Sequence, residues 1–131
     1  MIIDSSALVA ILRGEPEQGA FAEIIARSGG ARFSAAGYLE TTVVIDRARD
    51  PVVSCALDPF LTANGIDVEP VTPAQARIAR EAYRDFGKGS GHPAQQNVGD
   101  CYSYALATAL GEPILFEGED FGHTALQAAG V

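Results

Sequence analysis

The stretch that decides the fold is Met1-Ile2-Ile3-Asp4-Ser5-Ser6, followed directly by the apolar run Ala7-Leu8-Val9-Ala10-Ile11-Leu12. Three apolar residues that end at an aspartate predict a short buried strand, and the hydroxyl residues after it predict the start of a helix, with Ser5 or Ser6 as its cap. In an open parallel sheet, ligands bind outside the carboxyl ends of the strands. Asp4 is therefore predicted at the edge where a site would form.

The rest of the chain alternates short apolar runs with longer helical stretches, a pattern typical of βα units around a parallel sheet. Further strands are expected over 31–34, 66–71 and 113–116, the second of them near an edge, and one helix is expected to follow Asp50-Pro51 as far as Asn64. A chain of 131 residues has the size of a single domain. The expected fold class is therefore α/β, with three α/β/α layers and a short central parallel sheet of four to five strands.

Charge and composition exclude several classes of protein. The net charge of −8 argues against a nucleic-acid binder that works by bulk electrostatics. Cys55 and Cys101 fit no metal-binding spacing and are predicted to be small buried hydrophobes in a reducing compartment. No secretory signal is recognisable, and the longest apolar run is too short to cross a bilayer. We therefore expect a cytoplasmic protein with no membrane contact.

Four carboxylates occupy strand-end or helix-start positions: Asp4, Glu40, Asp100 and Asp120. Glu40 lies in the second turn of a predicted helix, and because helical side chains lean toward the N-terminus it can point back to the sheet edge. Each of the last three has a simpler explanation on its own: Asp100 as a helix cap, Glu40 as a solvated residue and Asp120 as a turn residue. Position alone leaves a shared site and these separate roles equally open.

Carboxylates that meet repel and desolvate one another, and a hard divalent cation relieves that cost. Mg²⁺ and Mn²⁺ prefer oxygen ligands and keep several waters. Such an ion can activate water and neutralise charge on a scissile phosphate, which suits phosphodiester hydrolysis. The sequence offers no Ser-His-Asp or Cys-His arrangement as a competing catalytic group.

Four blocks of the sequence carry motifs. They are Met1-Ile2-Ile3-Asp4-Ser5-Ser6-Ala7-Leu8, Ser34-Ala35-Ala36-Gly37-Tyr38-Leu39-Glu40, Asn97-Val98-Gly99-Asp100-Cys101-Tyr102-Ser103-Tyr104-Ala105-Leu106-Ala107 and Pro113-Ile114-Leu115-Phe116-Glu117-Gly118-Glu119-Asp120-Phe121. In this order they resemble the PIN-domain ribonucleases, in particular the VapC toxins of toxin–antitoxin pairs. The resemblance covers essentially the whole chain, so residues 1–131 are interpreted as a single PIN domain.

The resemblance implies a PIN-like fold and a Mg²⁺-dependent endoribonuclease, with Mn²⁺ as a possible substitute, that leaves a 5′-phosphate and a 3′-hydroxyl. It assigns catalysis to the four acids Asp4, Glu40, Asp100 and Asp120, and metal binding to Asp4, Asp100 and Asp120. Ser6, Asn97 and Glu119 are supporting residues, with Ser6 as a partner of Asp120. The family often has Gly-Asn-Asp where this chain has Gly118-Glu119-Asp120, which leaves open which of Glu117, Glu119 and Asp120 contacts the metal.

The resemblance also implies partners. A cognate VapB-like antitoxin would place an Arg or Lys in the acid pocket, and two copies of the toxin would form a homodimer through apolar helices. For the RNA substrate, the sequence offers a stripe of cations at helical spacing: Arg77, Arg80, Arg84 and Lys88. A solvated helix face is the simpler explanation of this stripe, because Glu81 and Asp85 are interspersed with it.

Other proteins with acidic pockets fit less well. A response-regulator receiver needs a second acid after strand one and a late lysine, whereas this chain has Ser5 after Asp4 and no lysine after Lys88. A phosphatase of the haloacid dehalogenase type needs an aspartate where Ser6 stands. The remaining alternative is a catalytically weak PIN domain that acts as a protein- or RNA-binding module.

Overall fold

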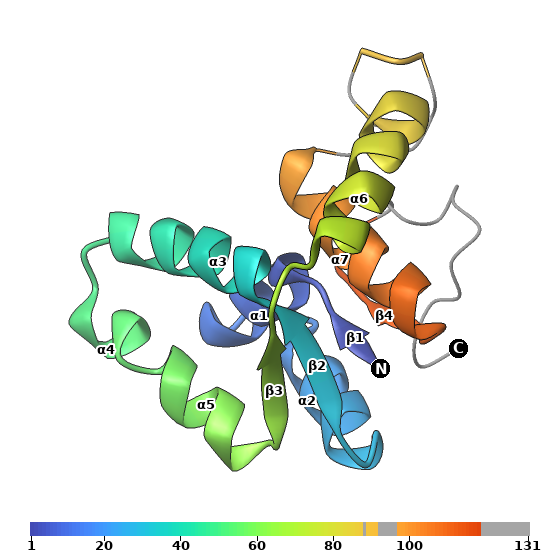
Figure 1. The fold of residues 1–131 in the computed structure, drawn as a ribbon. Coiled ribbons are helices and arrows are strands. Elements are labelled where there is room, and N and C mark those ends of the chain that lie inside the picture. Colours follow the sequence, from blue (N-terminus) through green and yellow to red (C-terminus); the bar gives the residue numbers. More distant parts are fainter. Residues whose placement is uncertain (88, 92–96, 119–131) are drawn as a thin grey trace.

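In the part of the chain that the structure describes, the sheet is parallel and has four strands in the order β3-β2-β1-β4. The structure, a computed structural model, describes residues 1–87, 89–91 and 97–118. The strands are short, and β3 lies at an edge as predicted (Figure 1). Their bounds are β1 Ile2–Ile3, β2 Ala31–Ser34, β3 Ile66–Glu69 and β4 Ile114–Leu115.

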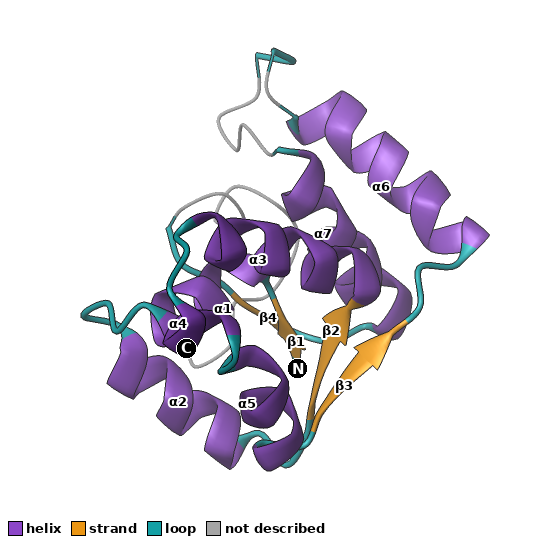
Figure 2. Cartoon of the chain, turned by 90° about the vertical axis from the view of Figure 1, so that its left-hand side faces the viewer, coloured by secondary structure: helices purple, strands orange, loops and turns teal. Residues whose placement is uncertain are grey.

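Helices cover both faces of this sheet, so the predicted three-layer α/β/α architecture is confirmed (Figures 1 and 2). In the described ranges, none of them is long and apolar enough to span a bilayer. Their bounds are α1 Ser5–Leu12, α2 Gln18–Arg27, α3 Ala35–Arg47, α4 Pro51–Ser54, α5 Leu57–Ala63, α6 Pro73–Phe86 and α7 Val98–Leu110.

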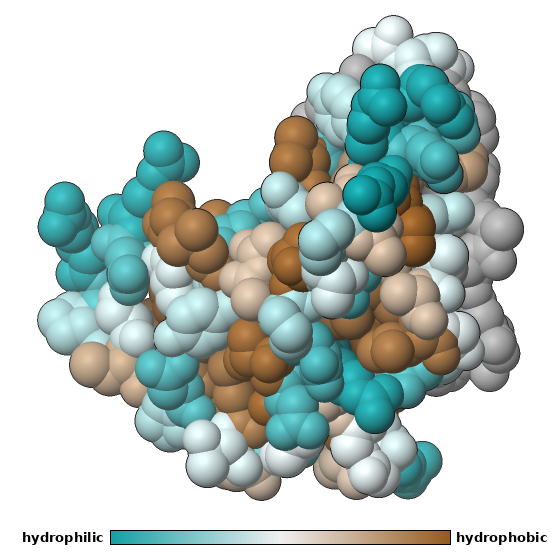
Figure 3. Space-filling view, viewed as in Figure 1, coloured by the Kyte–Doolittle hydropathy of each residue, from teal (hydrophilic) through white to brown (hydrophobic). Residues whose placement is uncertain are grey.

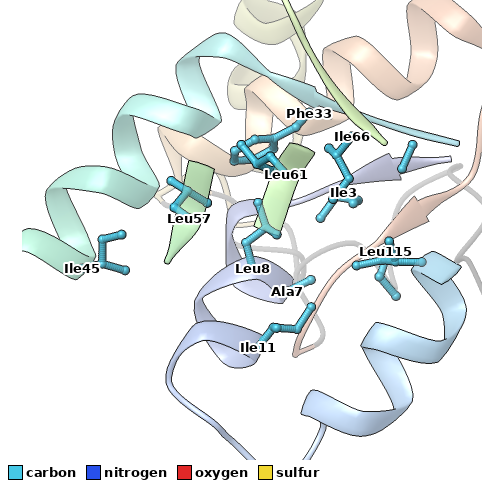
Figure 4. Close-up of a cluster of buried hydrophobic side chains, with 12 residues drawn as sticks. Ile3, Ala7, Leu8, Ile11, Phe33, Ile45, Leu57, Leu61, Ile66 and Leu115 are labelled. Carbon is cyan, nitrogen blue, oxygen red and sulfur yellow. The ribbon is translucent and has the colours of Figure 1, made fainter. Parts of the chain in front are cut away.

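Strand β1 is buried on both faces, which explains its uninterrupted apolar sequence. Ile2 packs against Leu106 of α7 on one face, and Ile3 joins the main core with Leu8 and Phe33 on the other (Figure 4). Both isoleucines are fully buried. Successive side chains of a strand point to opposite faces, so a two-residue strand can anchor both helical layers. The residue that follows, Asp4, is thereby fixed at the carboxyl edge of the sheet.

The single helix predicted from Pro51 to Asn64 is wrong. The structure has two helices, α4 and α5, separated at Cys55 and Ala56. Pro59 accounts for the break, because it has no N–H to donate to the carbonyl of Cys55, four residues earlier, and its ring would clash with that carbonyl. In the first turn of α5 the same proline is tolerated, since N–H groups there have no partner within the helix.

The two cysteines differ in environment. Cys101 is buried in α7, as predicted, whereas Cys55 lies between α4 and α5 and is exposed, so the prediction that both are buried is wrong for Cys55. Burial, followed by the negative charge of Asp100, raises the pKa of the Cys101 thiol to about 12. Cys101 is therefore a protonated, packed side chain at neutral pH.

Candidate active site at the carboxyl edge of the sheet

Asp4 is held by both of its carboxylate oxygens. Its Oδ2 accepts a hydrogen bond of 3.0 Å from the backbone N–H of Ser6, so Asp4 itself caps α1, and the prediction of Ser5 or Ser6 as the cap is wrong. Its Oδ1 accepts a hydrogen bond of 2.5 Å from the hydroxyl of Ser103 in α7. Only 1% of Asp4 is exposed. A buried strand-end carboxylate is thus tied to two helices.

Asp100 lies in the first turn of α7. The alternative that Asp100 is the N-cap of this helix is wrong. The cap is Asn97, whose side-chain Oδ1 accepts from the Asp100 N–H at 2.9 Å. The Asp100 carboxylate in turn accepts from the Asn97 N–H at 2.9 Å, which completes a capping box. Asp100 is 5% exposed, so this capping contact holds a buried carboxylate at the helix start.

Glu40 of α3 contacts the first residue of α1 and the second residue of α7. Its Oε1 accepts a hydrogen bond of 2.7 Å from the Ser5 hydroxyl. On its other side it packs against Gly99, where an added Cβ would come within 1.8 Å of the Glu40 Oε2. Asp4 and Asp100 belong to the same two helix starts, because Asp4 caps α1 and Asp100 follows Gly99 directly. The structure therefore brings Asp4, Glu40 and Asp100 to one edge of the sheet.

Ser6 connects α1 to the chain that leaves β4. Its hydroxyl accepts a hydrogen bond of 3.0 Å from the backbone N–H of Glu117. The predicted partner of Ser6 is Asp120, which lies outside the described residues, as do Glu119 and Lys88. The contact with Glu117 nevertheless brings the segment after β4 to the start of α1.

A second group of acids was missed by the sequence analysis. Among the described residues, Glu15, Glu17 and Glu117 have carboxylate oxygens that all lie within 4.8 Å of one another. Burial, followed by the charges of Glu15 and Glu17, raises the pKa of the Glu117 carboxyl above its ordinary value. Glu15 and Glu17 lie just before α2, which begins at Gln18. These acids precede the helix and face the segment after β4.

Three further residues that contact the acids carried no recognised signal in the sequence. Ser5 and Ser103 donate to Glu40 and Asp4, and Gly99 makes room for the Glu40 carboxylate. The spacing of Ser103 was the available clue: residues three apart lie on the same face of a helix, so Ser103 shares a face with Asp100.

The cationic stripe follows the exposed surface of α6, beside α7. Arg77, Arg80 and Arg84 are exposed, and Arg84 forms an ion pair of 3.0 Å with Asp85. Arg80 also lines a cavity of about 230 Å³ between the two helices, together with Tyr83 and Tyr102. Figure 3 shows a hollow between α3 and the projecting α6–α7 pair, with apolar side chains on α3 and near the start of α7.

The donors at the sheet edge fit a hard divalent cation. Asp4 and Asp100 are buried carboxylates supplied by adjacent elements, and carboxylate oxygens are the ligands that Mg²⁺ prefers. A carboxylate offers about four lone-pair sites, so one that accepts two hydrogen bonds can also ligate an ion. Hydrogen bonds such as those from Ser6 and Ser103 are the support that ligating carboxylates commonly have.

The chain matches known proteins along nearly its whole length. The family model described as the PIN domain matches residues 1–126. Ribonuclease VapC28 of Mycobacterium tuberculosis is 55% identical over 129 residues, which cover 98% of this chain and 97% of that protein. Ribonuclease VapC42 of the same species is 49% identical over 129 residues, covering 98% of each.

Solved structures share the fold at low sequence identity. The crystal structure of Mycobacterium tuberculosis VapC20, described as a Sarcin-Ricin loop cleaving toxin, superposes with a TM-score of 0.76 at 19% identity and covers 95% of each chain. The family model spans nearly the whole chain, and a named VapC ribonuclease is 55% identical to it over 98% of its length. The chain therefore belongs to the PIN-domain family, in its VapC branch.

Proposed function

We propose that the chain is a Mg²⁺-dependent endoribonuclease and the toxin of a toxin–antitoxin pair, formed by one PIN domain over residues 1–131 and acting in the cytoplasm. The observation that carries this proposal is the arrival of two buried carboxylates, Asp4 and Asp100, at the carboxyl edge of a parallel sheet. Relatives that are about half identical to the chain are named VapC ribonucleases, which supports an RNA substrate.

The roles of the acids follow from where they are held. Asp4 and Asp100 would bind the ion, and Asp120 would complete the set of ligands. When bound by these residues, a divalent cation would supply charge neutralisation at the scissile phosphate and an activated water, and cleavage would leave a 5′-phosphate and a 3′-hydroxyl. Glu40, fixed between Ser5 and Gly99, would orient that water or accept its proton. The backbone N–H of Ser6 donates to Asp4, and the Asn97 side chain accepts from the Asp100 N–H, so these two residues support the helix starts at which the carboxylates lie.

RNA would reach the acids along α6. Arg77, Arg80 and Arg84 present guanidinium groups on an exposed helix face, and arginine binds phosphate through a planar fork of donors. In a protein of net charge −8, such a local stripe of cations is suited to binding a polyanion. We also assign Lys88 to this stripe from its spacing.

Two protein partners complete the proposal. A cognate VapB-like antitoxin would insert an Arg or Lys among the acids, which suits the chain's net charge of −8. A solved toxin–antitoxin complex from Klebsiella pneumoniae has the same fold, with a TM-score of 0.71 at 13% identity over 95% of this chain and 92% of that one. A second copy of the chain would cover α3, where Leu39 and Val43 lie one turn apart and are 65% and 47% exposed.

RNA cleavage with and without EDTA tests the proposal. The wild type, Asp4→Asn and Asp100→Asn are compared on one RNA, with Asp46→Asn as a matched control that alters an exposed acid of α3. We expect cleavage by the wild type and the control only when Mg²⁺ is present, and little or none by the other two. Cleavage that EDTA does not affect, or full activity in both site variants, would contradict the proposal. Metal binding without any cleavage would favour a binding module.

A further inference from the structure

The hydroxyl of Ser103 touches the carboxylate of Asp4 in a place closed to solvent. Its Oγ lies 2.5 Å from Asp4 Oδ1, and each of the two residues is 1% exposed. They are 99 residues apart in sequence, so the contact joins the first strand to α7. A hydrogen bond from a hydroxyl to a carboxylate is short and about twice as strong as one between neutral groups.

The helix that carries Ser103 also carries Asp100. Residues three apart lie on one face of a helix, so α7 presents the Ser103 hydroxyl and the Asp100 carboxylate to the same region. The Asn97 capping box holds Asp100 at the start of α7. One turn later, the hydrogen bond from Ser103 ties the same helix to Asp4. The position of Asp4 relative to Asp100 is thus set through one rigid turn of helix.

We propose that Ser103 is a positioning residue that orients the Asp4 carboxylate for binding of a divalent cation, an inference that rests on the proposed function. The Ser6 N–H holds Oδ2, and the Ser103 hydroxyl holds Oδ1. Without the Ser103 hydroxyl, Oδ1 loses this hydrogen bond and the orientation of the carboxylate is less restricted. Ordering the Asp4 carboxylate would then cost free energy each time an ion binds to the two acids.

A purely structural role predicts a different result. If Ser103 only filled space and satisfied a buried acceptor, its loss would lower the melting temperature and leave ion affinity unchanged in the folded fraction. Thr41 of α3 provides a matched control, because its side chain is fully buried and its hydroxyl has no hydrogen-bond partner in the described part of the chain. Thr41→Val removes a buried hydroxyl of that kind without touching Asp4.

The test is the affinity of the purified protein for Mn²⁺ alone, measured by calorimetry or electron paramagnetic resonance. Ser103→Ala is expected to bind Mn²⁺ about 10-fold or more weakly than the wild type, the range found when partners of metal ligands are removed. Ser103→Thr keeps the hydroxyl and is expected to stay within about 3-fold, and Thr41→Val is expected to match the wild type. Ser103→Cys keeps the shape with a weak donor and should show the loss if the alanine variant does not fold.

Kinetics give a second measurement. For Ser103→Ala we expect RNA cleavage to recover toward the wild-type kcat at saturating Mn²⁺, with the KM for RNA unchanged, because the defect lies in holding the ion. Wild-type Mn²⁺ affinity in Ser103→Ala, or an equal loss in Thr41→Val, would overturn the inference. Asp4→Asn and Asp100→Asn distinguish failure of the Ser103 inference from failure of the proposed function. If both variants also bound Mn²⁺ like the wild type, the proposed function would fail together with the inference about Ser103.

Discussion

The carboxylate of Glu40 lies against the α-carbon of Gly99, closer than any side chain at that position would allow. A Cβ on Gly99 would stand 1.8 Å from Oε2 and 2.4 Å from Cδ of Glu40. The carboxylate is also bound to the Ser5 hydroxyl, so it cannot move away without losing that hydrogen bond. A side chain at position 99 would therefore have to displace the Glu40 carboxylate, which comes from another helix.

Gly99→Ala should therefore displace Glu40 and reduce RNA cleavage by about 10- to 100-fold, since small misplacements of catalytic groups cost rates of that order. The measurement is the cleavage rate at saturating Mg²⁺. Gly19→Ala is the matched control: Gly19 also lies in a helix, no atom lies near its would-be Cβ, and alanine there should leave cleavage unchanged and slightly raise stability. A wild-type rate in Gly99→Ala would show that the position of Glu40 does not matter.

Asp100→Asn should separate the contribution of Asp100 to helix capping from its contribution to metal binding. An asparagine keeps an oxygen that can accept from the Asn97 N–H, so the capping box and the melting temperature without metal should change little, by about 2 °C or less. Cleavage should fall by a factor of about 100 or more, because the ligand charge is gone. A large fall in melting temperature with cleavage retained would mean that Asp100 serves the helix alone.

The three glutamates outside the main site predict a pH dependence. The pKa of Glu117 is raised in the folded protein, so the folded state binds this proton more tightly than the unfolded chain. The free energy of unfolding therefore falls as pH rises from the ordinary glutamate range through the raised pKa. Glu117→Gln should raise the melting temperature by about 1–2 °C at pH 8 and give no gain at pH 4.

The control for this comparison is Glu81→Gln, which removes the same charge from an exposed position on α6. Equal stabilisation by both variants would point to the net charge of −8 rather than to repulsion among Glu15, Glu17 and Glu117.

Cys55 should react with a thiol reagent before Cys101 does. Cys55 is exposed, whereas Cys101 is 2% exposed and its pKa is raised to about 12, so its thiolate is scarce at pH 8. A thiol reagent should modify one cysteine per chain in the folded state and two in denaturant, and Cys55→Ser should abolish the first reaction. Rapid modification of Cys101 in the native protein would contradict the packing of α7 against α6.

Local sequence was sufficient where one residue type dictates one structure. The apolar run before Asp4 predicted a short buried strand. The position of Glu40 predicted that it would point to the sheet edge, because helical side chains lean toward the helix N-terminus. The family resemblance added the expectation that the four motifs, taken in their order along the chain, form one site. It did not predict how Asp100 is held: the cap of α7 is Asn97, and Asp100 occupies the third helical position.

The contacts between distant segments were not predictable from sequence. Nothing local marks Ser103 as a donor to Asp4, 99 residues away, or Gly99 as the seat of Glu40. Acids before a helix, such as Glu15 and Glu17, are favoured by the helix dipole alone, and only the course of the chain after β4 brings Glu117 to them. The break between α4 and α5 was predictable from Pro59, but the apolar periodicity around it hid the signal.

The central claim is that Asp4 and Asp100 together hold a divalent cation, and the shift of melting temperature by Mg²⁺ tests it most directly. A ligand that binds only the folded state stabilises it by RT ln(1 + [L]/Kd), so a saturating concentration should raise the wild-type melting temperature by about 5 °C or more. We expect the same shift in Glu117→Gln and none in Asp4→Asn or Asp100→Asn. A full shift in both aspartate variants, or its loss in Glu117→Gln alone, would contradict the account.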